Sequence, residues 1–307
     1  MTEKLAGLEI CLLGGDAREV EAALFFQAWG ARLTVCGLNS ERFREKVHVT
    51  DDPVAAVAQA QLVLAPVLGT DGEGRVYALQ KPAPVLNETV LRSMPANCPL
   101  FIGLAQPWLR SLAVKVGRKL VEFRERDDFA ILNSVPSAEG AIAMAMERMP
   151  ITIHGAQAFV LGFGRTGNTL ARMLHGIGAH VWVAARRPEV LAQIAAHCYH
   201  AVPFNKLADY IQLAEVIFNT VPALVLDRSL LSRLPPGTVV IDLASYPGGV
   251  DFPSAAQLGI PAVLAPGLPA RVAPHTAGLI VAETVLRLFL PEYSPPVITC
   301  GRGGTWD

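Results

Sequence analysis

The sequence AFVLGFGRTG at residues 158–167 is an apolar run that leads directly into the pattern G-x-G-x-x-G. In nucleotide-binding βαβ units the first glycine makes a tight turn, the second lets the backbone approach a pyrophosphate, and the third lets the helix pack on the strand. Here they are Gly162, Gly164 and Gly167, and a helical pattern follows over residues 168–176. The stretch therefore predicts a Rossmann unit whose helix N-terminus binds a dinucleotide. The residues between the glycines, expected to complete the turn, are Phe163, Arg165 and Thr166.

The end of the next predicted strand indicates which dinucleotide binds. An acidic residue there would hold a free ribose 2′-hydroxyl, whereas arginine accommodates a 2′-phosphate. The chain reads VWVAARR over residues 181–187, and no Asp or Glu lies between Gly167 and Arg187. Because guanidinium donors match phosphate oxygens, Arg186 and Arg187 favour NADP over NAD. The alternative is two solvated arginines at the end of a strand.

Loops after later strands of this half complete the expected cofactor site, because ligands of open α/β sheets bind beyond the carboxyl ends of the strands. Such loops follow the predicted strands 216–220, 239–243 and 262–264. Asp242 lies at the same edge and is a candidate proton acceptor, or it caps a turn. The expected cofactor contacts in these loops are Thr220, Val221, Pro222, Leu243, Ala244, Ser245, Pro266 and Gly267.

Short apolar strands alternate with Ala-rich helical segments along the chain, which is typical of βαβ units around a mostly parallel sheet. At roughly 150 residues per domain, the 307 residues suffice for two domains. We predict two doubly wound, Rossmann-like α/β domains, at 1–135 and 150–275, with a cleft between them. Crossover helices at 137–149, capped by Ser137, and at 276–290, capped by Thr276, would join them, the second packing back onto the N-terminal domain. Two separate domains on one linker are the alternative. Further strands are expected at 8–13, 32–36, 62–66, 100–103, 158–161 and 180–184.

The composition excludes several classes of protein. With 26 Lys plus Arg against 27 Asp plus Glu, the net charge of −1 gives no field that attracts nucleic acid. The long uncharged stretch 53–70 contains two prolines and a glycine, so we expect no membrane role. Five scattered cysteines without a C-x-x-C pair favour a reducing compartment, the cytoplasm. His197, Cys198 and His200 are too close in sequence to complete a tetrahedral site alone, so we expect no metal.

Two further segments carry the expected substrate-binding residues. The sequence GGDAR at 14–18 follows a predicted strand but lacks a third glycine, so Arg18 is a candidate for binding a small carboxylate, with ordinary turn chemistry as the alternative. The charge run 124–128 leads through a strand-like stretch, 129–132, to the expected crossover, and Arg126 would bind a second carboxylate. Plain helix capping is the alternative for the polar residues that follow. The expected pocket residues are Asn133, Ser134, Ser137 and Glu139, of which Glu139 is the other candidate proton acceptor.

Several of these blocks occur together and in order in one family, and over nearly its whole length the chain resembles the A subunit of dipicolinate synthase. The resemblance implies oxidation of dihydrodipicolinate, or of its 4-hydroxy-tetrahydro precursor, to dipicolinate with NADP as acceptor. It also implies a flavoprotein-like B subunit of dipicolinate synthase as partner and the mother cell of a sporulating bacterium. The blocks are at residues 14–18, 125–128, 133–134, 162–167, 242–245, 247–249, 265–269 and 277–278.

Two other functions fit the same sequence. An NADP-dependent dehydrogenase of another small carboxylic acid would have a similar architecture, but such enzymes depend on a His–carboxylate pair or a Lys base, and we find no convincing His-Glu or His-Asp arrangement. A non-catalytic nucleotide-binding subunit is the other alternative, with apolar residues of 276–290 as its partner surface. The sequence leaves a homo-oligomer open.

Overall fold

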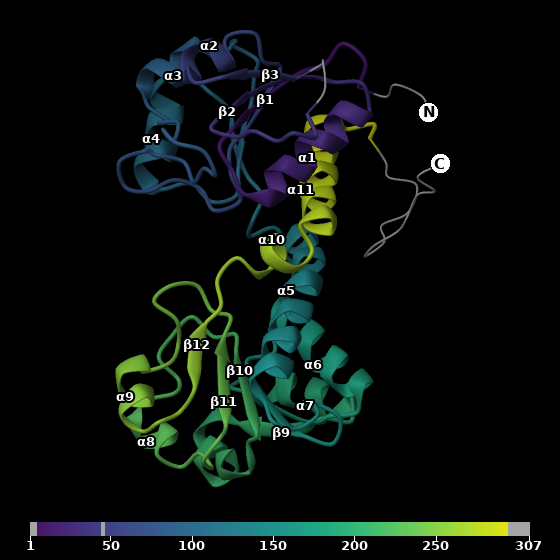
Figure 1. Cartoon of the computed structure of the whole chain (residues 1–307), viewed down its shortest axis with the longest axis vertical. Helices are drawn as coiled ribbons and strands as arrows, with labels where there is room; N and C mark the ends of the chain where they lie inside the picture. Colours follow the sequence, from purple (N-terminus) through teal and green to yellow (C-terminus); the bar gives the residue numbers. More distant parts are fainter. Residues whose placement is uncertain (1–4, 44–46, 294–307) are drawn as a thin grey trace. The chain divides into compact units, whose positions relative to one another are not determined.

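The computed structural model describes residues 5–43 and 47–293, and Figure 1 shows two compact units. The described residues of Met1–Leu132 and Ala273–Asp307 form the first unit, and Asn133–Val272 forms the second. Each unit contains one six-stranded sheet in which the paired strands are parallel. The predicted fold class of two doubly wound α/β sheets is therefore confirmed.

The first sheet has the strand order β3-β2-β1-β4-β5-β6, so the direction of winding reverses beside β1. Helix α11, the last described helix, returns to this unit and packs against α1 (Figure 1). The strands are β1 (Glu9–Leu13), β2 (Arg32–Cys36), β3 (Val47–Thr50), β4 (Leu62–Leu64), β5 (Leu100–Ile102) and β6 (Leu120–Glu122). The helices are α1 (Ala17–Ala28), α2 (Pro53–Val57), α3 (Glu88–Ser93), α4 (Pro107–Lys115) and α11 (Pro274–Phe289).

The second sheet repeats this topology with the order β12-β11-β10-β7-β8-β9, so that β7 corresponds to β1. Two 3₁₀ helices, η1 (Phe204–Asp209) and η2 (Ile211–Leu213), follow β9. The strands are β7 (Gln157–Leu161), β8 (His180–Ala185), β9 (His200–Pro203), β10 (Val216–Asn219), β11 (Val239–Asp242) and β12 (Ala262–Leu264). The α-helices are α6 (Arg165–Ile177), α7 (Pro188–Ala196), α8 (Arg228–Leu231), α9 (Phe252–Gln257) and α10 (Leu268–Val272), and α5 (Asp127–Arg148) enters from the first unit.

Each sheet is covered on both faces, as the alternation of side chains along its central strands requires. In β7, Ala158 and Val160 belong to one buried cluster, together with residues of α5 and α6. Phe159 and Leu161 point to the opposite face and belong to a second cluster with residues of η1 and α8. Because both faces are apolar, the carboxyl edge of the sheet is left as the place for polar chemistry.

Helix α5 corrects the expected strand at 129–132. Asp127 and Asp128 occupy the first turn of α5, where negative charge is stabilised by the helix dipole. Phe129 is fully buried in this helical conformation, with its ring 5.2 Å from that of Phe123. Tertiary burial of this side chain, together with the acidic first turn, outweighs the strand preference of a short apolar run.

The two expected helix caps are also wrong. Ser137 lies inside α5, where its Oγ donates a hydrogen bond to the carbonyl of Asn133 at 2.9 Å. The neighbouring Pro136 is accommodated within the same helix instead of opening a new one. Helix α11 begins at Pro274 and not after Thr276, because proline has the φ that a first helical position requires.

Among the described residues, α5 is the one helix long and apolar enough to meet the length and hydropathy criteria for a membrane span. Half of that apolar window is buried inside the protein. Its alanines Ala138, Ala141 and Ala145 belong to the cluster that covers β7. These contacts are those of a core helix.

Candidate functional site

The turn between β7 and α6 leaves no room for a side chain at two of its three glycines and open space at the third. Gly162 has a φ of 95°, and a Cβ there would lie 2.6 Å from Thr220 Oγ1. A Cβ on Gly167 would lie 2.2 Å from the carbonyl oxygen of Gly162, so α6 packs on the turn only without a side chain at this position. Gly164 is the N-cap of α6 with no side-chain cap, and a Cβ there would meet nothing within 4 Å. The first turn of α6 is thus open on the side where a pyrophosphate would bind.

A pocket of about 510 Å³ lies beside this turn. Its walls come from the glycine turn, the end of β8, the first turn of α7, the start of η1 and the loop after β10. A mostly apolar wall with a few cationic groups is typical of a site for a nucleotide. The lining residues are Gly162, Phe163, Gly164, Ala185, Arg186, Arg187, Val190, Phe204 and Val221.

The two arginines at the end of β8 differ in their surroundings. Arg187 Nη1 lies 3.3 Å from Glu189 Oε1, and both side chains are exposed. Arg186 is also exposed and lines the pocket, but it forms no ion pair or hydrogen bond with any residue that the structure describes. Arg186 is therefore the better placed of the two to receive an anionic group.

The remaining predicted cofactor contacts lie around the carboxyl edge of the second sheet. Arg165 and Thr166 begin α6 directly after Gly164. Thr220 Oγ1 donates to the carbonyl of Leu161 at 2.8 Å and so ties the end of β10 to β7. The cofactor roles of all the predicted contacts stay predictions. Those that do not line the pocket are Arg165, Thr166, Gly167, Thr220, Pro222, Leu243, Ala244, Ser245, Pro266 and Gly267.

The two candidate proton acceptors have opposite environments. Asp242 is fully buried at the end of β11, and its carboxylate accepts hydrogen bonds from Asn219 Nδ2 and from the backbone N–H groups of Ala244 and Gly249. Glu139 is exposed on α5. Of the two, only Glu139 is accessible to a substrate in this structure.

The predicted substrate-binding residues near the crossover lie on or before α5. The hydroxyls of Ser134 and Thr169 are 2.6 Å apart and join α5 to α6. Asn133 Oδ1 is buried and has no hydrogen-bond partner among the described residues. Arg126 Nε lies 3.1 Å from Asp128 Oδ1, with nearly half of the arginine side chain exposed. The substrate roles of these residues, and of Ser137, stay predictions.

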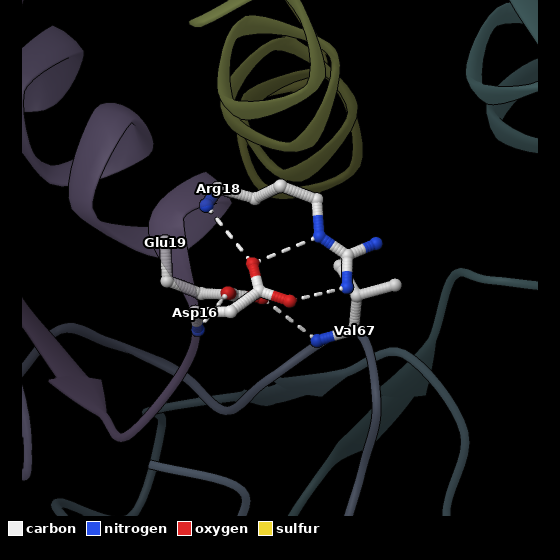
Figure 2. A network of polar contacts seen from close by, with 4 residues as sticks. All are labelled: Asp16, Arg18, Glu19 and Val67. Atoms are coloured by element: carbon white, nitrogen blue, oxygen red, sulfur yellow. Dashed lines mark hydrogen bonds and ion pairs between the residues drawn. The ribbon is translucent and has the colours of Figure 1, made fainter. Parts of the chain in front are cut away.

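Arg18 is held by the N-terminus of its own helix (Figure 2). Its Nε and Nη2 donate to Asp16 Oδ1 and Oδ2 at 3.0 and 2.7 Å, and its side chain is 3% exposed. Burial raises the pKa of Asp16, but the hydrogen bonds and charge of Arg18 outweigh it and lower that pKa below its ordinary value. The guanidinium that the sequence assigns to a substrate carboxylate thus already has a carboxylate partner.

Glu19 completes this network and is a residue that sequence reasoning missed. Its Oε2 accepts the N–H of Asp16 at 2.8 Å, which forms a capping box, and its Oε1 accepts the N–H of Val67 at 2.9 Å (Figure 2). Glu19 is fully buried, and burial together with the charge of Asp16 raises its pKa to about 7. The signal available in the sequence was the D-x-x-E spacing at a helix start.

The side chains of His197 and His200, which the sequence does not assign to a metal, pack against aromatic rings in the structure. The ring of His197 stacks on Tyr199, with centroids 5.7 Å apart, and that of His200 stacks on Trp182 at 4.2 Å. Within the part of the chain that the structure describes, no group of three His, Cys, Asp or Glu residues could hold a metal ion.

Comparison with known proteins matches nearly the whole chain. The dipicolinate synthase A subunit of Bacillus subtilis (strain 168) is 39% identical over 289 residues, covering 92% of this chain and 96% of the relative. The crystal structure of the dipicolinate synthase A subunit from Bacillus halodurans has a TM-score of 0.87 at 37% identity, covering 93% of this chain and 99% of that one. The corresponding crystal structure from Bacillus subtilis has a TM-score of 0.83 at 38% identity, covering 93% and 97%. A transhydrogenase from Sinorhizobium meliloti, at 16% identity and a TM-score of 0.65 over 91% and 92%, shares the fold alone.

Two family models match separate parts of the chain. Residues 9–124 match the N-terminal domain of the dipicolinate synthase A subunit. Residues 143–252, which include the glycine turn and its pocket, match shikimate / quinate 5-dehydrogenase, a Rossmann-type domain of oxidoreductases. The sequence identity over nearly the full length confirms the resemblance that the motifs indicated. The chain belongs to the family of dipicolinate synthase A subunits.

Proposed function

We propose that the chain is the NADP-dependent oxidoreductase subunit of a dipicolinate synthase and oxidises dihydrodipicolinate, or its 4-hydroxy-tetrahydro precursor, to dipicolinate. The observation that carries this proposal is the pocket beside the glycine turn, where Arg186 lies at the end of β8 in place of an acidic residue. Membership of the family supports the choice of substrate, because the relatives are named as dipicolinate synthases.

The residues of the pocket fit NADP. Gly164 leaves the first turn of α6 open for the pyrophosphate, and Arg186 offers paired donors to a 2′-phosphate. Val190 and Phe204 supply apolar surface for the adenine ring. When bound there, NADP would take up a hydride from the substrate.

In this reaction the main task of the protein is to position the substrate ring against the nicotinamide. Conversion of the dihydro ring to a pyridine releases a hydride and a proton, and formation of the aromatic ring supplies much of the driving force. Glu139 is the favoured proton acceptor because it is exposed, whereas Asp242 is buried. If the hydrated precursor is the substrate, water leaves first and general acid–base catalysis carries more of the barrier.

Arg126 is the proposed ligand for a substrate carboxylate. Its guanidinium is partly exposed and forms an ion pair with Asp128 close to the surface. Exposed pairs of this kind contribute at most about 1 kcal/mol, so a dicarboxylate can replace Asp128 at low cost. Arg18 is a weaker candidate, since its bond to Asp16 is buried.

A second, different subunit is part of the proposal, because the relatives are named as the A subunit of their enzyme. We expect a flavoprotein-like B subunit, in the cytoplasm of the mother cell of a sporulating bacterium. The contribution of this B subunit to turnover is tested by assaying the chain with and without it.

The test of the proposed function is incubation of the purified chain with dihydrodipicolinate and NADP, with formation of NADPH and dipicolinate followed together. Both products are expected, at rates to be compared with and without the B subunit. Reduction of NADP by lactate-like acids, and not by dihydrodipicolinate, would instead identify a dehydrogenase of another carboxylic acid. NADPH binding without any turnover, even with the B subunit present, would identify a non-catalytic nucleotide-binding protein.

A further inference from the structure

The register of the second sheet places two buried polar side chains side by side at its carboxyl edge. Asn219, the last residue of β10, is paired with Asp242, the last residue of β11. Both are fully buried, whereas the strands leading to them carry apolar side chains. Burial of a carboxylate and an amide is costly unless each is fully hydrogen-bonded, so the pair demands a physical reason.

The carboxylate of Asp242 accepts three hydrogen bonds from three different parts of this edge. Asn219 Nδ2 and the backbone N–H of Ala244 donate to Oδ1 at 2.8 and 3.0 Å. The backbone N–H of Gly249 donates to Oδ2 at 2.6 Å. Asp242 therefore closes the loop 243–249 onto the end of its own strand.

Asn219 extends this network to the loop that lines the nucleotide pocket. Its Oδ1 accepts the N–H of Val221 at 3.0 Å, and its Nδ2 donates to the carbonyl of Val221 at 3.0 Å. Both amide hydrogens and the amide oxygen of Asn219 are thus in use. Val221 in turn lines the pocket beside Gly162, where its Cγ2 would lie 3.0 Å from a Cβ at that glycine.

The loop after β11 packs so closely on Asn219 and Asp242 that two of its glycines have no room for a side chain. A Cβ on Gly248 would lie 2.5 Å from Asp242 Oδ2, and a Cβ on Gly249 would lie 2.5 Å from Asn219 Nδ2 and 2.6 Å from the carbonyl of Val221. The carbonyl of Gly249 also accepts the N–H groups of Val225 and Leu226. The loop after β11 is therefore held against the loop after β10 through side chain and backbone together.

We propose that Asp242 and Asn219 are positioning residues that hold Val221 in place against the nucleotide, and that Asp242 does not transfer the proton. This inference rests on the proposed function, because it assigns the pocket to NADP. Asp242 acts through Asn219 and touches neither cofactor nor substrate. A carboxylate suits the position because it only accepts hydrogen bonds, and three donors converge on it.

The variant Asp242→Asn separates positioning from proton transfer. Its amide NH₂ would face one of the three donors, so at least one hydrogen bond is lost and the loop with Val221 is released. We expect the Kd of NADPH, measured by isothermal titration, to rise about tenfold, the scale of one hydrogen bond to a charged group. The pH profile of kcat should keep its shape. A fall in kcat with a changed pH profile, at unchanged NADPH affinity, would show that Asp242 accepts the proton and would overturn the inference.

Asn219→Asp and the swapped double variant Asn219→Asp/Asp242→Asn provide a second test. In Asn219→Asp, carboxylate oxygens face both Asp242 and the Val221 carbonyl, so NADPH affinity should fall at least as far as in Asp242→Asn. The double variant restores one donor–acceptor bond between the two side chains, and we expect part of the affinity to return. No recovery in the double variant would contradict the coupling of the pair.

The matched control is Asp227→Asn, at an aspartate that caps α8 in the same unit through one backbone bond. NADPH affinity should be unchanged in this control. In the nucleotide-free protein, hydrogen exchange of the amides of Val221, Ala244 and Gly249 should be slow and should accelerate in Asp242→Asn but not in Asp227→Asn. Equal exchange in the three proteins would overturn the inference even if NADPH binds. Failure of the unmodified chain to bind NADPH, with the exchange pattern intact, would instead overturn the proposed function.

Discussion

The substitution Gly164→Ala separates nucleotide binding from folding. Gly164 has φ −81° and ψ −162°, a conformation that alanine adopts readily, and its added Cβ would meet no atom within 4 Å. Loss of glycine stabilises the folded state by about 0.4–1 kcal/mol through the unfolded chain. Alanine is a poorer N-cap than glycine by roughly 0.5–1 kcal/mol. These effects offset each other, so the free energy of unfolding should change by less than about 1 kcal/mol.

The effect on the nucleotide is of another kind. The new methyl group projects into the open space where the pyrophosphate must approach the first turn of α6. Displacing the phosphates by the size of a methyl group costs at least one charge-assisted hydrogen bond, about 1.5–3 kcal/mol. This loss corresponds to a rise of roughly 10–100-fold in the Kd of NADPH. Isothermal titration measures that Kd, and urea unfolding followed by circular dichroism measures the stability.

Gly176→Ala is the matched control for this experiment. Gly176 lies in the same helix, is exposed, and its Cβ would also meet nothing within 4 Å. Because Gly176 lies in the last turn of α6, where the cost of glycine is smaller than in a helix interior, this variant should gain at most about 0.5 kcal/mol of stability and keep the NADPH affinity of the unmodified chain. A folded Gly164→Ala protein that binds NADPH as tightly as the control would refute the assignment of the pyrophosphate to this turn.

Three other perturbations address separate parts of the molecule. Arg186→Ala should weaken NADPH binding by about 1–3 kcal/mol and barely change NADH binding, and equal losses by titration would remove the 2′-phosphate argument. Arg126→Ala should raise the KM for dihydrodipicolinate while leaving the Kd of NADPH nearly unchanged, and a parallel loss of both would count against a substrate role. Burial raises the pKa of Glu19 from 4.5 to about 7, so the folded state binds the carboxyl proton more tightly than the unfolded chain does. The stability that this proton contributes is therefore lost as the pH rises between those two values. Glu19→Gln, which cannot ionise, should remove this part of the pH dependence of the free energy of unfolding. Urea unfolding at pH 4.5 and pH 7 measures it, and the same pH dependence in Glu19→Gln as in the unmodified chain would show that Glu19 is not its source.

The central strands and the glycine turn could be predicted because their signals are local. Apart from 129–132, which is helical, the predicted strands are present with ends shifted by at most two residues, as where 62–66 ends at Leu64. The strands β3, β6 and β9 were missed because they are short and largely half-buried or exposed, with no apolar run to mark them. At the edge of a sheet, pairing with one neighbour is enough to hold such a strand.

The pocket could be predicted only in part, because tertiary structure brings its walls together. The glycines and Arg186 follow from spacing along one βαβ unit. Val190 and Phe204 are ordinary apolar residues in the sequence, and only the parallel arrangement of β7, β8 and β9 brings them beside the turn. The pairing of Asp242 with Asn219 likewise depends on the register of β10 and β11, which no single segment reveals.

The most direct measurement is isothermal titration of the unmodified chain with NADPH and with NADH under the same conditions. An exposed Arg186 and the absence of an acidic residue at the end of β8 predict that NADPH binds at least about tenfold more tightly, the scale of one hydrogen bond to a charged group. Equal or tighter binding of NADH would contradict the proposed cofactor. Absence of binding for both nucleotides would contradict a dinucleotide site at this turn.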